Sequence, residues 1–69
     1  LVIAREIGDR RGEGNALFNR ALAHEKLGER ERAIELAGDA LTIYRAIEDP
    51  NCGNVEARLR EWGVDPDAA

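Results

Sequence analysis

The stretch that decides the fold is residues 9–47, DRRGEGNALFNRALAHEKLGERERAIELAGDALTIYRAI. Apolar residues recur at helical spacing on both sides of Gly28, so the stretch predicts two helices, residues 10–27 and 30–47. A tight turn at Leu27-Gly28-Glu29 joins them. Short connections of this kind place two helices antiparallel. The expected fold class is therefore all-α, built on an antiparallel helical hairpin.

The predicted second helix carries a seam of three small residues and a tyrosine that faces the first helix. The seam consists of Ala33, Ala37, Ala40 and Tyr44. Small side chains there allow the two backbones to approach closely. The predicted first helix carries two adjacent stripes of mainly apolar residues, so we expect it to pack against two neighbouring helices. The first stripe is Leu17, Ala21, His24 and Gly28, and the second is Ala16, Arg20, Ala23 and Leu27.

Helical segments flank the hairpin on both sides. Residues 1–7 have helical spacing, and Gly8 followed by Asp9 predicts a helix stop and a new start. Asp49 and Pro50 predict an N-cap and the first position of a third helix, residues 50–62. The predicted packing face of this helix is Cys52, Val55, Leu59 and Trp62. Residues 64–69 are expected to form an acidic tail after Gly63.

Composition excludes several classes of function. The 69 residues are 43% apolar and 35% charged, which suits a soluble helical protein. The net charge of −4 comes from interspersed acids and bases, whereas nucleic-acid binding needs a basic stripe. No apolar run approaches the ~20 residues of a membrane span. The single cysteine, Cys52, favours a reducing, cytoplasmic setting. Because the chain begins with Leu1 instead of Met, we expect sequence upstream of it.

The chain matches itself when it is shifted by 40 positions. The matched pairs are Leu1/Leu41, Ile3/Ile43, Arg5/Arg45, Ile7/Ile47, Asp9/Asp49 and Arg20/Arg60. A period between about 20 and 50 residues indicates stacked helical units that cover one another's apolar faces.

Residues 14–28, together with Ala33, Ala37 and Ala40-Leu41, resemble a tetratricopeptide repeat. The longer form, with a period near 40 and a segment such as Gly8-Asp9-Arg10-Arg11-Gly12 between units, is the more similar one. It occurs in kinesin light chains, G-protein-signalling modulators and bacterial signalling ATPases. The resemblance implies a truncated preceding repeat at 1–8, a complete hairpin at 9–48, a C-terminal capping helix at 49–63 and a tail at 64–69.

The chain keeps the spacing of the repeat but departs from its chemistry. The family pattern has Trp-x₂-Leu-Gly-x₂-Tyr in the first helix and Ala-x₃-Phe in the second. The residues at these positions are Leu17, Arg20, Ala21, His24, Ala33 and Ala37. Arg20 replaces a leucine that would be buried between units, so we expect its stem to lie on the protein while its guanidinium reaches solvent.

The resemblance also implies a binding groove. First helices of such repeats line a concave surface that holds a peptide or a partner helix. The matching positions are Asn15, Phe18, Asn19, Leu22, Glu25 and Lys26. Asn19 stands where the family commonly has an asparagine that bonds a peptide backbone, and an amide can donate and accept at once. The alternative is that this face is simply solvated.

No residue set predicts catalysis, a cofactor or a metal ion. His24 has no partner at triad or metal-ligand spacing, which favours a packing role. Cys52 lacks a predicted histidine partner. The leading hypothesis is a non-catalytic protein–protein interaction module at the C-terminal end of a repeat array. The alternative is a structural end cap that associates with another copy through its N-terminal face. Either is compatible with membership of a larger signalling polypeptide.

Overall fold

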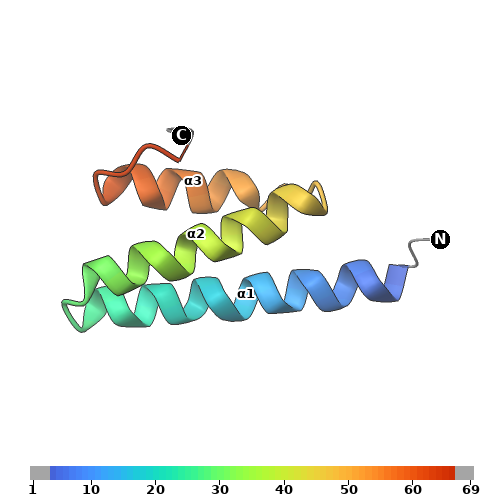
Figure 1. Ribbon diagram of the computed structural model, residues 1–69, viewed down its shortest axis with the longest axis horizontal. Coiled ribbons are helices and arrows are strands. Elements are labelled where there is room, and N and C mark those ends of the chain that lie inside the picture. The colour runs from blue at the N-terminus through green and yellow to red at the C-terminus, as the bar shows by residue number, and fades with distance from the viewer. Residues whose placement is uncertain (1–3, 67–69) are drawn as a thin grey trace.

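The computed structural model describes residues 4–66, which contain three helices and no strand (Figure 1). Helix α1 spans Ala4–Lys26, α2 spans Arg30–Ala46 and α3 spans Cys52–Glu61. Helix α2 lies between the other two and runs antiparallel to both (Figure 1). The predicted all-α class is confirmed. None of these helices is long and apolar enough to cross a membrane.

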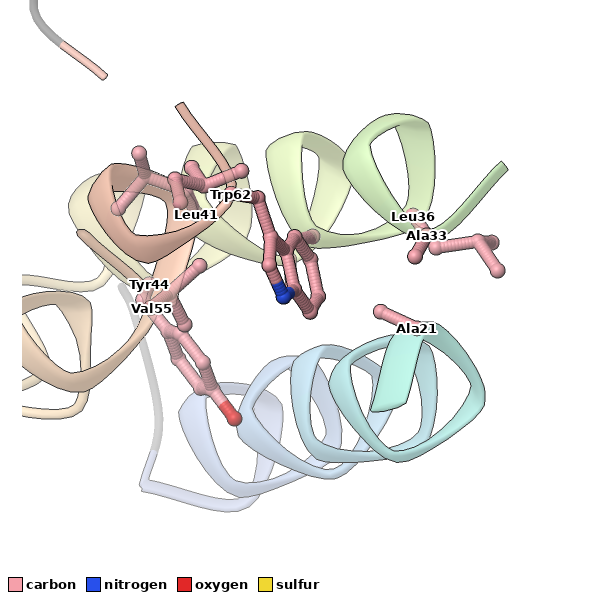
Figure 2. Close-up of a cluster of buried hydrophobic side chains, with 10 residues drawn as sticks. Ala21, Ala33, Leu36, Leu41, Tyr44, Val55 and Trp62 are labelled. Atoms are coloured by element: carbon pink, nitrogen blue, oxygen red, sulfur yellow. The ribbon is translucent and has the colours of Figure 1, made fainter. Parts of the chain in front are cut away.

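The core forms where α2 meets both neighbours (Figure 2). Every residue of the predicted small-residue seam is buried, and its three alanines are fully inaccessible. Ala21 of α1 is also fully inaccessible, so the two backbones meet closely at this point. From α3, the predicted face contributes Val55, Leu59 and Trp62. The sequence therefore identified the packing faces of α2 and α3 correctly.

Helix α1 differs from its prediction at the N-terminal end. The sequence predicted a stop at Gly8 and a separate helix at residues 1–7, but α1 continues through Gly8 and Asp9 without a break. A continuous helix keeps one backbone hydrogen bond per residue, and Arg10 and Glu13 form an ion pair (3.9 Å) just past the predicted stop. Asp9 is exposed, whereas Asp49, its counterpart at the 40-residue offset, is buried in the turn where the chain reverses direction between α2 and α3. Residues 1–3 of that predicted helix lie outside the described part.

The second stripe of α1 does not pack against a neighbour among the described residues. Ala16, Arg20, Ala23 and Leu27 are all exposed, and we call them the outer face of α1. Helix α3 packs on α2 instead. The residues of α1 that contact the core are Gly14, Leu17, Phe18, Ala21 and Leu22. The expectation of two neighbours for α1 is therefore wrong for this part of the chain.

All three helices end in the same hydrogen-bonded turn. After α1, the N–H of Gly28 donates to the carbonyl of Glu25 and that of Glu29 to His24 (3.0 and 2.9 Å). This is a Schellman motif, which requires a residue with positive φ. Gly28 and Gly63 supply it with φ of 82° and 84°, but after α2 the position is held by Glu48, with φ of 54°. A side chain in this conformation is strained, because its Cβ crowds the backbone.

The start of α3 has the N-cap hydrogen bond that the sequence predicted, but the regular α-helix begins two residues later than predicted. Asp49 Oδ1 accepts the backbone N–H of Asn51 at 2.8 Å, the bond that an N-cap carboxylate makes. Pro50 and Asn51 then form a turn closed by i→i−3 bonds, and the α-helix begins at Cys52. Tight first turns of this type are common at helix N-termini.

We expect the substitution Glu48→Gly to stabilise the protein by about 1 kcal/mol, because glycine adopts positive φ without steric cost. Urea denaturation followed by far-UV circular dichroism measures the difference. Gly28→Ala, which introduces a Cβ at the equivalent position after α1, should shift the midpoint in the opposite direction by a similar amount. An unchanged or lower midpoint for Glu48→Gly would contradict the strain assigned to Glu48.

Candidate functional site

An open hollow of about 390 Å³ lies between α1 and α3. Phe18 comes from α1, and the other lining residues come from α3: Asn54, Ala57, Arg58 and Glu61. Phe18 is half-buried and packs against the core, so its ring forms an apolar floor. The opposite wall is polar, with Arg58 and Glu61 joined by an ion pair of 3.1 Å. We call this hollow the α1–α3 groove.

Five of the six predicted groove residues divide into two sets. Phe18 lines the groove, Leu22 packs beside it against the core, and Glu25 is half-buried one turn further along α1. Asn19 and Lys26 are exposed. These side chains lie along one side of α1, as their spacing requires.

Asn15, the remaining predicted groove residue, is engaged within the protein. Its Oδ1 accepts a hydrogen bond from the Tyr44 hydroxyl. A free asparagine amide offers both a donor and an acceptor to a peptide backbone, and here the acceptor has a partner in α2. Asn15 therefore helps to hold α1 against α2.

The residues of α3 that line the groove were missed by the sequence reasoning. They fell within the predicted capping helix at 49–63, and none of the four had a functional assignment. The four positions follow an i, i+3, i+4, i+7 pattern, which marks a single helix face. The signal was present in the spacing, but it needed the position of α3 relative to Phe18 before it could be recognised.

A cluster of polar residues fixes α1 to the turn between α2 and α3. The Arg11 Nε–H donates to Oδ2 of Asp49, which is only 3% exposed. The backbone N–H of Asn51 holds the pKa of Asp49 below its ordinary value, against the opposing effect of burial, and Arg11 lowers it further. Asp49 is therefore a charged group at neutral pH that bonds to α1 and to the start of α3. We call Arg11, Asp49 and Asn51 the Asp49 cluster.

Tyr44 forms the second part of the same contact. Its ring is buried at 2% exposure, and burial raises the pKa of its phenol, an effect that the nearby Asp49 carboxylate strengthens and Arg11 opposes. The phenol thus stays protonated and donates to Asn15. A Cβ added at Gly14 would lie 2.9 Å from Tyr44 Cε1, which is closer than atoms pack. Gly14 therefore makes room for the Tyr44 ring.

The two residues considered for chemistry, His24 and Cys52, lie at helix ends in the described chain. His24 Nδ1 lies 2.8 Å from Glu29 Oε1, so the side chain spans the turn between α1 and α2. Cys52 is a free, half-buried thiol at the start of α3. Within residues 4–66, no three His, Cys, Asp or Glu side chains come together in a way that could hold a metal ion.

No protein-family model matches the chain, and neither a curated protein nor a solved structure matches it. The resemblance to tetratricopeptide repeats therefore stays a prediction from the sequence. Over residues 4–66, the structure shows three helices and a groove between the first and the third.

The two glycines at the start of the predicted hairpin provide a matched pair for testing the Tyr44 contact. Gly14→Ala should destabilise the protein by about 1–2 kcal/mol, because the new methyl group overlaps a buried ring that its bond to Asn15 holds in place. Gly12→Ala meets nothing within 4 Å and should stabilise by up to about 1 kcal/mol through helix propensity. Thermal unfolding of both variants would show equal shifts if Tyr44 did not constrain α1.

The Asp49 cluster predicts a defined pH dependence. Since the pKa of Asp49 is lower in the folded than in the unfolded chain, its contribution is complete above about pH 5 and is lost as pH falls through the folded value. Asp49→Asn should therefore be less stable than the native chain at pH 7, and the difference should shrink towards pH 3. Asp39→Asn, an exposed position on α2, serves as the control. A difference that stayed constant from pH 7 to pH 3 would contradict a role for the carboxylate charge.

Proposed function

We propose that this chain is a non-catalytic protein-binding module of the helical-repeat type, which holds a peptide or a partner helix in the α1–α3 groove. The observation that carries the proposal is the groove itself, a hollow of about 390 Å³ with an apolar floor and a polar wall. That volume falls within the range in which proteins hold ligand groups. It suits an apolar side chain of a partner flanked by polar backbone.

The chemistry of the lining residues supports this assignment. Phe18 offers an aromatic surface for an apolar anchor, and Asn54 and Arg58 offer hydrogen-bond donors on the facing helix. Asn19 and Lys26 extend the donor set along the exposed side of α1. Anchoring by one apolar residue and positioning by several polar groups is the usual division in such sites.

The position of the groove supports the proposal further. Its walls belong to α1 and α3, which the Asp49 cluster joins, and an Arg45–Glu56 bond of 2.7 Å holds α3 on α2. Walls fixed in this way lose little conformational entropy when a partner binds, which favours affinity. We also place the module in the cytoplasm, on the basis of its single cysteine.

A second candidate function is that of a structural end piece that contacts another protein chain edge to edge. The specific observation in its favour is the outer face of α1, where Leu27 is 72% exposed. Ala16 and Ala23 are exposed on the same face, and a contiguous exposed apolar patch is typical of contact surfaces. This function and groove binding use different sides of α1 and are compatible.

Selection of peptides from a random display library against the chain, followed by titration of the selected sequences, tests the groove. We expect Ala57→Arg, which fills the groove from α3, to weaken binding of the selected peptides by about tenfold or more. Ala46→Arg, an exposed alanine at the end of α2, is the matched control and should leave binding unchanged.

Amide chemical shifts recorded during the same titration provide an independent readout. Binding in the groove should move the signals of Phe18, Asn54 and Arg58 more than those of the outer face of α1. Selected peptides that bind the Ala57→Arg variant as tightly as the native chain would refute the proposal.

A further inference from the structure

Helix α3 is a small unit that is joined to the hairpin through a short linker. It has ten residues and packs chiefly on α2 (Figure 1). Its start carries an N-cap of its own, because Asp49 Oδ1 accepts the backbone N–H of Asn51 at 2.8 Å. This bond is local to α3 and moves with it. The part of the linker that can change conformation without disturbing either helix is therefore Ile47 and Glu48.

The turn that folds α3 back onto its own α2 is strained at Glu48. The turns that end the three helices each need a residue with positive φ, and glycine supplies it after α1 and after α3. After α2 a glutamate does so, with φ of 54°. Its Cβ crowds the backbone there, and this crowding is absent when φ is negative. Any conformation of the linker that releases the turn therefore removes a steric cost.

Opening this turn sacrifices no backbone hydrogen bond. In the closed turn, the Glu48 N–H donates to the Arg45 carbonyl at 3.2 Å, and the Asp49 N–H donates to the Tyr44 carbonyl at 2.9 Å. If α2 continues through Glu48, the same donors and carbonyls pair in the helical i→i−4 arrangement. Pro50 then ends the helix, because proline disfavours the helical conformation in the residue before it. The chain leaves α2 along the helix axis and carries α3 away from its own hairpin.

The helix that the structure shows to fit this side of α2 is α3, so a second copy of the chain carries a matching occupant. Its apolar face can form the same packing, and two polar contacts determine its register. Asp49 accepts a bond from Arg11 of α1, and Glu56 Oε2 accepts one from Arg45 of α2 at 2.7 Å. In each pair the two residues lie on opposite sides of the Ile47–Glu48 hinge in the sequence. Both contacts can therefore form between two chains with unchanged geometry.

We propose that two copies of this chain exchange α3 and form a domain-swapped dimer, in which each third helix packs on the α2 of the other copy. Because the exchange is reciprocal, it closes on itself and gives a dimer instead of a longer assembly. The dimer keeps the contacts of the monomer and relieves the strain at both copies of Glu48. Mass action favours it as the concentration rises. The α1–α3 groove then forms between two chains, with Phe18 from one copy and Arg58 from the other.

Sedimentation equilibrium from about 10 μM to about 1 mM tests the role of the hinge. We expect the mean mass of the native chain to rise towards that of a dimer and not beyond it. Glu48→Gly should lower the association constant by about tenfold or more, because glycine removes the strain from the closed turn of both chains. This variant is expected to be the more stable monomer, so weaker association cannot come from unfolding. Glu48→Gln keeps the Cβ and removes the charge, and it should associate like the native chain.

Reversed charges across the α2–α3 contact distinguish exchange from a dimer formed through outer surfaces. Arg45→Glu and Glu56→Arg, made in separate chains, each place like charges between α2 and α3, both in the monomer and in a dimer of identical chains. In a mixed swapped dimer, each α3 meets an α2 of opposite charge. An equimolar mixture should therefore form dimers at concentrations about tenfold or more below those that either variant needs alone. One chain with both substitutions pairs the charges internally and should associate like the native chain.

Three results would overturn the proposal. They are a native chain that stays monomeric up to about 1 mM, a Glu48→Gly chain that associates as strongly as the native one, and a mixture no more associated than its two components. Ala57→Arg changes an exposed residue that lines the α1–α3 groove, so it should leave the association constant unchanged. The outcome is therefore independent of the proposed peptide binding.

Discussion

The close approach of α1 and α2 is the constraint on which the rest of the structure depends. It requires positions with almost no side chain: Ala21 on one helix and the alanines of the seam on the other, all fully inaccessible. Alanine buries little apolar area by itself, so the contact gains stability only because larger groups then surround it. Tyr44 fills one end of the contact where Gly14 leaves space, and the Trp62 ring points into the region between the three helices (Figure 2). Small and large residues are thus interdependent in this core.

Helix α3 has its place because of what the hairpin leaves uncovered. Val55 and Leu59 cover the side of α2 that α1 does not reach, and Asp49 holds the start of α3 through bonds to Arg11 and Asn51. A buried carboxylate is tolerated only when donors surround it, and here the donors come from two different elements. The same bonds determine where the wall of α3 stands relative to Phe18. The bonds of Asp49 and the packing of α3 on α2 therefore place the two walls of the groove together.

The sequence predicted the elements whose signals are local, and it failed where the outcome depends on more distant parts of the chain. The turn at Gly28, the seam on α2 and the packing face of α3 all follow from spacing and from the backbone freedom of glycine. The stop at Gly8 was wrong, although it matches Glu48 at the 40-residue offset. A helix ends at such a position only if the chain after the turn packs against the rest of the protein. Asp49 is buried in this way, whereas Asp9 is exposed. For the groove, α1 supplies Phe18, while Leu22 packs beside it against the core. Asn15 accepts a hydrogen bond from Tyr44, a partner that pattern reasoning could not place beside it.

The single indole of the protein occupies an informative position. Trp62 closes the C-terminal end of α3, is 8% exposed and belongs to none of the hairpin elements. Its emission therefore reports whether α3 is docked, whereas far-UV ellipticity is dominated by the 40 helical residues of α1 and α2, the sum of 23 and 17. Helix α3 has only ten residues and contacts chiefly α2. Undocking α3 therefore breaks fewer contacts than separating α1 from α2, so local unfolding is expected to begin there. A red shift of the tryptophan spectrum that precedes the loss of ellipticity would reveal undocking of the third helix as a separate event from melting of the other two.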